Sequence, residues 1–105
     1  MKQLHERITS WGDKTFGPPE TRSPLGPLNH LIEEAYECID KPDDGYEYAD
    51  CLILIFQAAH LAGFEYDDLH DHVVAKMIIN EARKYPPVED QPKDQPVHRL
   101  GRGKE

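Results

Sequence analysis

Five acidic residues stand close together in the sequence, and their side chains are the ones best suited to chemistry. Glu33, Glu34 and Glu37 occupy one short stretch, and Glu47 and Asp50 follow after a brief interruption. In a helix, at about 100° per residue, the first three fall within an arc of roughly 100° opposite the apolar side. We therefore expect three carboxylates to converge on one helix face.

The second acidic pair, Glu47 and Asp50, precedes an apolar run over residues 51–56. Residues three apart are neighbours on a helix. A carboxylate that begins a buried helix loses hydration, so it becomes protonated or needs a partner. If a short turn pairs the two acidic helices antiparallel, up to five carboxylates share one site. Divalent cations relieve their repulsion, and an all-oxygen donor set favours Mg²⁺ or Mn²⁺ over Zn²⁺. The simpler alternative is a solvated acidic surface.

Three polar residues form a second stripe in the last third of the chain. Lys76, Asn80 and Arg83 follow one another at spacings of four and three, which places them on one side of a helix. The two cations suit phosphate oxygens, and the amide can donate to or accept from a sugar or base. An ordinary exposed helix face is the alternative.

Aromatic residues near the N-terminus provide a third set. Trp11 and Phe16 stand at the head of a long loop, where they could stack on a nucleobase, and His30 lies beside the acidic face. Packing of Trp11 in the core is the alternative.

The elements that must position these side chains are helices. Apolar residues recur at helical spacing, and no segment shows the period-two alternation of a half-buried strand, so we predict an all-α fold. We expect Gly12 to end the first helix, an irregular loop over residues 13–26 and a turn over residues 41–45. The predicted helices span about residues 2–11, 27–40, 46–62 and 67–85.

The third predicted helix is apolar nearly all round over residues 51–56, which is typical of a helix covered on every side. A chain of 105 residues has a thin core, so we expect a second copy to complete the burial of a four-helix bundle. Residues expected to face the core are Leu28, Leu31, Ile32, Ala35 and Ile39 on the second helix, and Val73, Val74, Met77, Ile78 and Ala82 on the fourth.

The composition limits the possible partners. The chain holds 20 Asp and Glu against 12 Lys and Arg, a formal net charge of −8, which argues against binding to nucleic acid or to anionic membranes. The longest apolar stretch, over residues 51–64, contains Gln57 and His60 and falls short of the roughly 20 residues of a membrane span. No secretory leader is evident, so we expect a soluble cytoplasmic protein with Cys38 and Cys51 as reduced thiols.

Two regions are expected along the chain. Residues 1–85 carry the helices and the candidate site. Residues 86–105 are rich in proline and charge and poor in apolar residues, which is typical of a flexible tail.

The acidic residues resemble known motifs. Glu33-Glu34-Ala35-Tyr36-Glu37 and Glu47-Tyr48-Ala49-Asp50 are similar to the EExxE and ExxD motifs of the MazG-like all-α NTP pyrophosphatases. Over about residues 8–85 the chain looks like the phage and bacterial dATP/dGTP pyrophosphohydrolase branch of that superfamily. The residues that carry this second resemblance are Trp11, Thr15-Phe16-Gly17-Pro18, His30-Leu31, Pro42-x-Asp44, Gly63, and Lys76 with Asn80.

The resemblance implies an enzyme that hydrolyses a purine dNTP, dGTP or dATP, to dNMP and pyrophosphate as a homotetramer or homodimer. It implies two or three Mg²⁺ or Mn²⁺ ions per site, held by Glu34, Glu37, Glu47 and Asp50, while Glu33 assists a second ion or orients water. Lys76 and Asn80 would contact the nucleotide. If the source is a phage, the enzyme would work in the host cytoplasm.

Two other functions are compatible with parts of the sequence. The acidic faces could bind a basic partner in a non-catalytic helical interaction module. His70-Asp71 invites comparison with histidine-aspartate phosphohydrolases, although the other ligands of such a site are not evident.

Overall fold

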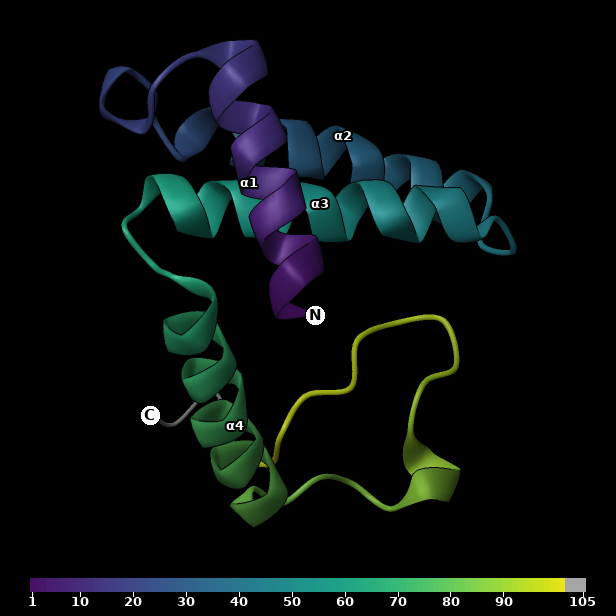
Figure 1. Ribbon diagram of the computed structural model, residues 1–105. Helices are drawn as coiled ribbons and strands as arrows, with labels where there is room; N and C mark the ends of the chain where they lie inside the picture. The colour runs from purple at the N-terminus through teal and green to yellow at the C-terminus, as the bar shows by residue number, and fades with distance from the viewer. Residues whose placement is uncertain (102–105) are drawn as a thin grey trace. The chain divides into compact units, whose positions relative to one another are not determined.

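The computed structural model describes residues 1–101 and confirms the all-α prediction, because this part of the chain contains four α-helices and no strand (Figure 1). The chain divides into two compact units, residues 1–70 and the segment from Asp71 onward. The α-helices are α1 (Lys2–Phe16), α2 (Leu25–Asp40), α3 (Gly45–Leu61) and α4 (Tyr66–Ala82), and two short 3₁₀ helices are η1 (Pro19–Thr21) and η2 (Val88–Asp90).

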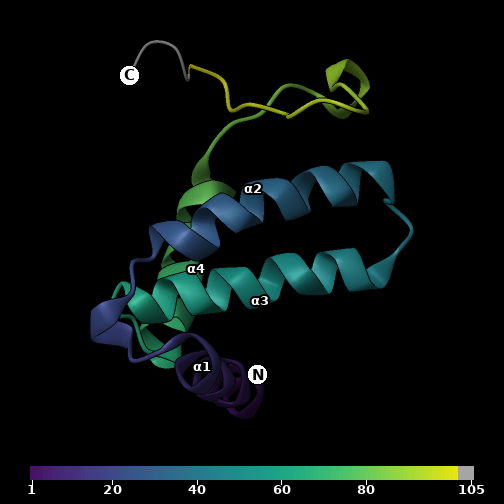
Figure 2. The same cartoon turned by 90° about the horizontal axis from the view of Figure 1, so that it is seen from above.

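The first unit is built on an antiparallel hairpin of α2 and α3 (Figure 2). The turn between them is closed locally: the Asp44 side chain accepts a hydrogen bond from the Tyr46 amide at 2.9 Å, and the Tyr48 hydroxyl donates to the Pro42 carbonyl at 2.7 Å. Asp44 is thus the N-cap of α3, and it satisfies an amide that the helix leaves unpaired. The C-terminal half of α2 therefore lies beside the N-terminal half of α3.

Helix α1 crosses α3 (Figure 1). The observed end of α1 differs from the predicted one. Gly12 does not stop α1, which continues to Phe16. Gly12 is instead buried against α3: a Cβ atom there would lie 3.2 Å from Gln57 Nε2, so its missing side chain allows close approach of the two helices. The helix ends at Gly17, whose φ of 105° is a conformation that favours glycine.

The other helix boundaries differ from the predictions by a few residues. Helix α2 begins at Leu25, two residues earlier than expected, and the Leu25 amide donates to Ser23 Oγ at 3.1 Å. Helix α4 begins at Tyr66 and ends at Ala82, three residues before the predicted end. The long irregular connection is thereby shortened and contains η1.

The core of the chain is small. Ile8, Leu54, Phe56 and Ala58 are its buried apolar residues. The His5 ring packs edge-on against Phe56, with ring centroids 5.1 Å apart. This core joins α1 to α3 and does not surround α3.

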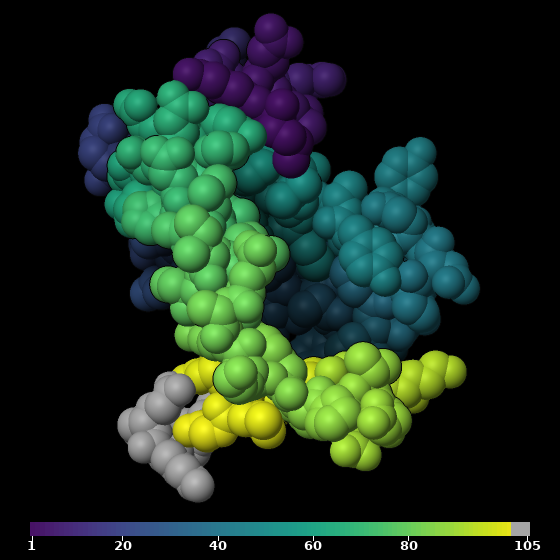
Figure 3. Space-filling view, turned by 90° about the horizontal axis from the view of Figure 1, so that it is seen from below, coloured from purple at the N-terminus to yellow at the C-terminus, as the bar shows by residue number. Residues whose placement is uncertain are grey.

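Several residues expected to face the core are exposed in the single chain. Their burial by a second copy stays a prediction. On α3, Leu52 is 42% and Ile55 37% exposed. The spacing of apolar residues predicts which helix face is apolar, but it does not predict which element covers that face. The other exposed members of the predicted set are Leu28, Ile32, Ala35 and Ile39 on α2, and Val73, Val74, Met77, Ile78 and Ala82 on α4, whose surface is green in Figure 3.

The second unit contains the rest of α4 and the segment that follows. The Leu100 amide donates to the Lys84 carbonyl at 2.7 Å, and Gln91 Nε2 donates to the Pro86 carbonyl at 2.9 Å. The predicted tail begins at residue 86, and its last four residues, 102–105, lie outside the described part of the chain. Its flexibility stays a prediction. None of the helices in the described range is both long enough and apolar enough to cross a membrane.

Candidate functional site

Three carboxylates meet across the α2–α3 hairpin. Glu34 comes from α2, and Glu47 and Asp50 come from one turn of α3; one oxygen from each lies within 4.8 Å of the others. The antiparallel pairing produces this group, because it brings the C-terminal half of α2 to the start of α3. Three carboxylate oxygens at this spacing could hold a divalent cation.

The negative charges around Glu47 disfavour the ionised form of its carboxylate. The pKa of Glu47 is raised above its usual value, first by partial burial and then by the charges of Glu37, Asp44 and Glu34, while Lys41 acts in the opposite direction. Burial and like charges both disfavour the ionised carboxylate, whereas a bound cation would favour it. The perturbed carboxylate therefore identifies this group as a candidate functional site.

The other two predicted ligands, Glu33 and Glu37, are not part of the three-carboxylate group. Both are exposed on α2. Glu37 is close enough for its charge to raise the pKa of Glu47. The structure thus brings together three of the five predicted carboxylates and places a fourth within electrostatic range.

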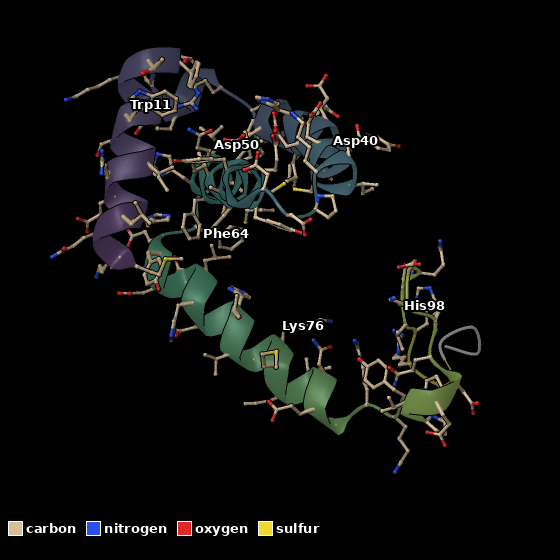
Figure 4. The ribbon with its side chains drawn as sticks, turned by 90° about the vertical axis from the view of Figure 1, so that its right-hand side faces the viewer. Trp11, Asp40, Asp50, Phe64, Lys76 and His98 are labelled. Carbon is tan, nitrogen blue, oxygen red and sulfur yellow. The ribbon has the colours of Figure 1, made fainter. Side chains whose placement is uncertain are left out.

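A pocket of about 250 Å³ adjoins the carboxylates, with Glu34 and Asp50 in its wall. Trp11 and Asp50 are labelled in Figure 4, on α1 and α3. Trp11 is 52% exposed, so the alternative in which Trp11 packs in the core is wrong. The complete lining is Trp11, Phe16, His30, Glu34, Asp50, Ile53, Leu54 and Gln57.

The aromatic residues of this pocket are held in defined positions. Trp11 and Phe16 pack edge to face, with ring centroids 5.4 Å apart. His30 Nε2 lies 3.2 Å from Glu34 Oε1, one helical turn away on α2. The three predicted aromatic and imidazole contacts therefore line the same pocket as two of the carboxylates.

A polar network supports the loop that carries Phe16, and sequence reasoning missed it. Asp13 Oδ1 accepts from Arg22 Nη1 at 3.1 Å, and Asp13 Oδ2 lies 3.0 Å from His60 Nε2. Arg22 Nη1 also donates to the Gly17 carbonyl at 3.1 Å, and the Arg22 guanidinium lies 5.6 Å from the centre of the Phe16 ring. The network ties the end of α1 to α3 and to the following loop.

Gln57 is a second residue that sequence reasoning missed. It lines the pocket, is 6% exposed, and its Nε2 has no hydrogen-bond partner in the described chain. Gln57 and His60 are the two polar residues that interrupt the apolar stretch of α3. That interruption was the available signal, because a polar side chain in a buried run needs a partner.

The predicted phosphate stripe lies in the second unit. Lys76, labelled in Figure 4, Asn80 and Arg83 all belong to the segment after residue 70. Asn80 Oδ1 accepts a hydrogen bond from Arg83 Nη1 at 3.0 Å, so these two residues are neighbours.

Two other predictions concern residues outside the carboxylate group. Within residues 1–101, the possible metal-holding group does not include His70 or Asp71, the pair that suggested a histidine-aspartate site. Cys38 and Cys51 are free thiols, as expected, and their sulfur atoms lie 3.5 Å apart between α2 and α3. Partial burial, the hydrogen bond to Cys51 and nearby negative charges raise the pKa of Cys38 to about 11.

One family of known proteins matches nearly the whole chain. The family model described as dATP/dGTP pyrophosphohydrolase matches residues 4–102. No curated protein and no solved structure matches the chain. The matched range includes every residue of the carboxylate group and of the pocket beside it.

Proposed function

The chain belongs to the dATP/dGTP pyrophosphohydrolase family, a family of MazG-like all-helical hydrolases that act on nucleoside triphosphates, and from that premise we propose its substrate and cofactor. The substrate is a purine deoxynucleoside triphosphate, dGTP or dATP, and the products are dNMP and pyrophosphate. The cofactor is Mg²⁺, which Mn²⁺ can replace. The observation that carries the proposal is the three-carboxylate group beside a pocket lined by aromatic residues.

Glu34, Glu47 and Asp50 are the proposed metal ligands, since their oxygens lie close enough to share an ion. Glu37 and Glu33 are proposed to assist a second or third ion or to orient the attacking water. An all-oxygen donor set suits Mg²⁺ and Mn²⁺. Such ions would supply positive charge against the triphosphate and favour deprotonation of the attacking water. The water oxygen would bond to the α-phosphorus as the bond to the bridging oxygen breaks and pyrophosphate leaves.

The pocket is proposed to receive the base and sugar. Trp11 and Phe16 offer ring faces and edges for stacking, and His30 is oriented by Glu34. Lys76, Asn80 and Arg83 are proposed to contact the nucleotide from α4. Their helical spacing and the Asn80–Arg83 hydrogen bond support a joint role.

We propose that the protein is a homodimer or homotetramer. The support is the amount of apolar side chain exposed on one chain, including Leu52 and Ile55 on α3, Ile39 on α2 and Ile78 on α4. Contiguous exposed apolar surface marks interaction sites, and Leu52 and Ile55 are exposed within one turn of the same helix. Sedimentation velocity should show a dimer or tetramer at micromolar concentration, and a strict monomer would contradict the proposal.

The remaining proposals concern the chain and its location. Residues 1–85 are proposed as the catalytic domain and residues 86–105 as a flexible tail. The proposed location is the cytoplasm, or the host cytoplasm for a viral source, because deoxynucleoside triphosphates are found there.

The experiment is a release assay for pyrophosphate over eight nucleotides, the four common dNTPs and the four NTPs, with Mg²⁺, Mn²⁺ or EDTA. We expect dGTP or dATP to give the fastest release, and EDTA to abolish it. Glu34→Gln and Asp50→Asn should remove activity while keeping the helical circular dichroism. Glu20→Gln, an exposed change on η1, is the matched control. No release from any dNTP with either metal would refute the proposal.

A further inference from the structure

Gln57 carries a polar group in an unfavourable position. The residue is 6% exposed, and its Nε2 is buried without a hydrogen-bond partner in the described chain. Buried amide groups are nearly always paired, because an unpaired one forfeits its hydrogen bonds to water. An exception within the apolar stretch of α3 indicates a group whose hydrogen-bond partner comes from outside the chain.

The surroundings of Gln57 indicate where that partner would lie. Gln57 lines the 250 Å³ pocket that contains Trp11, Glu34 and Asp50. It also lines an adjoining pocket of about 330 Å³, and Phe16, His30, Leu54 and Gln57 belong to both. The amide therefore stands where two hollows meet beside the aromatic residues.

The helix sets the distance between Gln57 and the carboxylates. Asp50 and Gln57 are seven residues apart on α3, which is two turns on one face and about 10 Å along the helix axis. This separation is within the span of a nucleotide from its α-phosphate to its base. A nucleotide with its phosphates at Asp50 would thus bring its base to Gln57.

The chemistry of the amide selects the edge of a purine. Guanine and adenine both present the N7 acceptor, whereas pyrimidines have no such atom. An NH₂ donor is the complement of N7. Gln57 Nε2 now packs beside Gly12, where a Cβ would lie 3.2 Å away, and the broad terminal torsion of glutamine allows the amide to turn toward the pocket.

We propose that the Gln57 side chain binds the base, donating from Nε2 to purine N7, and so selects purines over pyrimidines. This assignment rests on the proposed function. It accounts for acceptance of both dATP and dGTP, because the contact uses the acceptor that the two bases share.

The test compares natural substrates with 7-deaza-dGTP and 7-deaza-dATP, in which a C–H group replaces N7 and the ring system is kept. For the wild-type protein we expect kcat/KM to fall about five- to tenfold for each analogue, which corresponds to one hydrogen bond. Gln57→Met, close in volume, should lower kcat/KM for the natural substrates by a similar factor and abolish the difference between each substrate and its analogue. Gln3→Met, on the exposed part of α1, is the matched control.

The outcomes separate this inference from the proposed function. If wild-type protein releases pyrophosphate from dGTP or dATP but handles the 7-deaza analogues equally well, Gln57 does not bind N7, and the inference fails alone. A discrimination factor that persists in Gln57→Met also overturns it. If the wild-type protein releases no pyrophosphate from purine dNTPs, the proposed function itself fails. The wild-type comparison needs no variant, so a folding defect in Gln57→Met cannot obscure the result.

Discussion

Replacement of Asp50 by asparagine should change stability in opposite directions with and without Mg²⁺. Glu34, Glu47 and Asp50 lie 13 to 16 residues apart across the hairpin or within one turn, so only the folded chain holds their oxygens within 4.8 Å. A ligand that binds only the folded state stabilises it by about 2.7 kcal/mol at 100 times Kd. For a domain of this size, about 1 kcal/mol shifts Tm by roughly 4 °C, so saturating Mg²⁺ should raise Tm by about 10 °C.

Without metal, the same substitution removes a repulsion. Two unit charges 4.8 Å apart in a water-like dielectric repel by about 0.9 kcal/mol, and Asp50 is exposed to solvent and to screening by salt. We therefore expect Asp50→Asn to raise Tm by up to about 4 °C in EDTA. In Mg²⁺ the wild-type protein should be the more stable of the two, because the variant has lost a ligand.

The assay is thermal unfolding followed by circular dichroism at 222 nm, at one protein concentration and constant ionic strength. Mg²⁺ is titrated against an EDTA reference for the wild-type protein, Asp50→Asn and the surface control Glu20→Gln. The control should respond to Mg²⁺ as the wild-type protein does. A variant that keeps the full Mg²⁺ shift would refute the role of Asp50, and a wild-type Tm that ignores both Mg²⁺ and Mn²⁺ would refute the metal site.

Three further predictions concern single residues. Gly17→Ala should lower Tm by about 4 °C, since φ of 105° costs an alanine about 1 kcal/mol; an unchanged melting curve would contradict this. Burial, and next the charge of His60, lower the pKa of His5. Below about pH 6.5 the unfolded chain therefore binds more protons than the folded chain, and the stability of the fold should fall as the pH drops. The Tm of His5→Phe, measured from pH 7 to 5, should fall less steeply than that of the wild-type protein. Because the pKa of Cys38 is about 11, its alkylation by iodoacetamide should keep accelerating up to that pH, and mass spectrometry showing a plateau near pH 8.5 would disprove the shift.

The sequence predicted the helices well because their signals are local. Apolar spacing located all four, and the short turn before Tyr46 correctly implied the antiparallel hairpin that joins Glu34 to Asp50. Gly12 was misread because a glycine that ends a helix and a glycine that admits a neighbouring helix look alike in one dimension. Only the 3.2 Å approach of Gln57 distinguishes them.

The parts of the site that could not be predicted depend on contacts between distant residues. Asp13 and His60 are 47 positions apart, and no spacing rule connects them. Gln57 is a polar residue in an apolar stretch, and its role depends on the pocket that it lines. The apolar side of α4 was visible in the sequence, but an apolar face does not identify its neighbour, and residues such as Ile78 remain exposed in the single chain.

The turn between α2 and α3 has a consequence for how this protein can vary. Between Asp40 and Gly45 it contains four residues, and these fix the rotational phase of one helix against the other. One residue inserted near the start of α3 would rotate Glu47 and Asp50 by about 100° about the helix axis, away from Glu34. The register of Glu47 and Asp50 along α3 is therefore as much a requirement for ion binding as their carboxylates themselves.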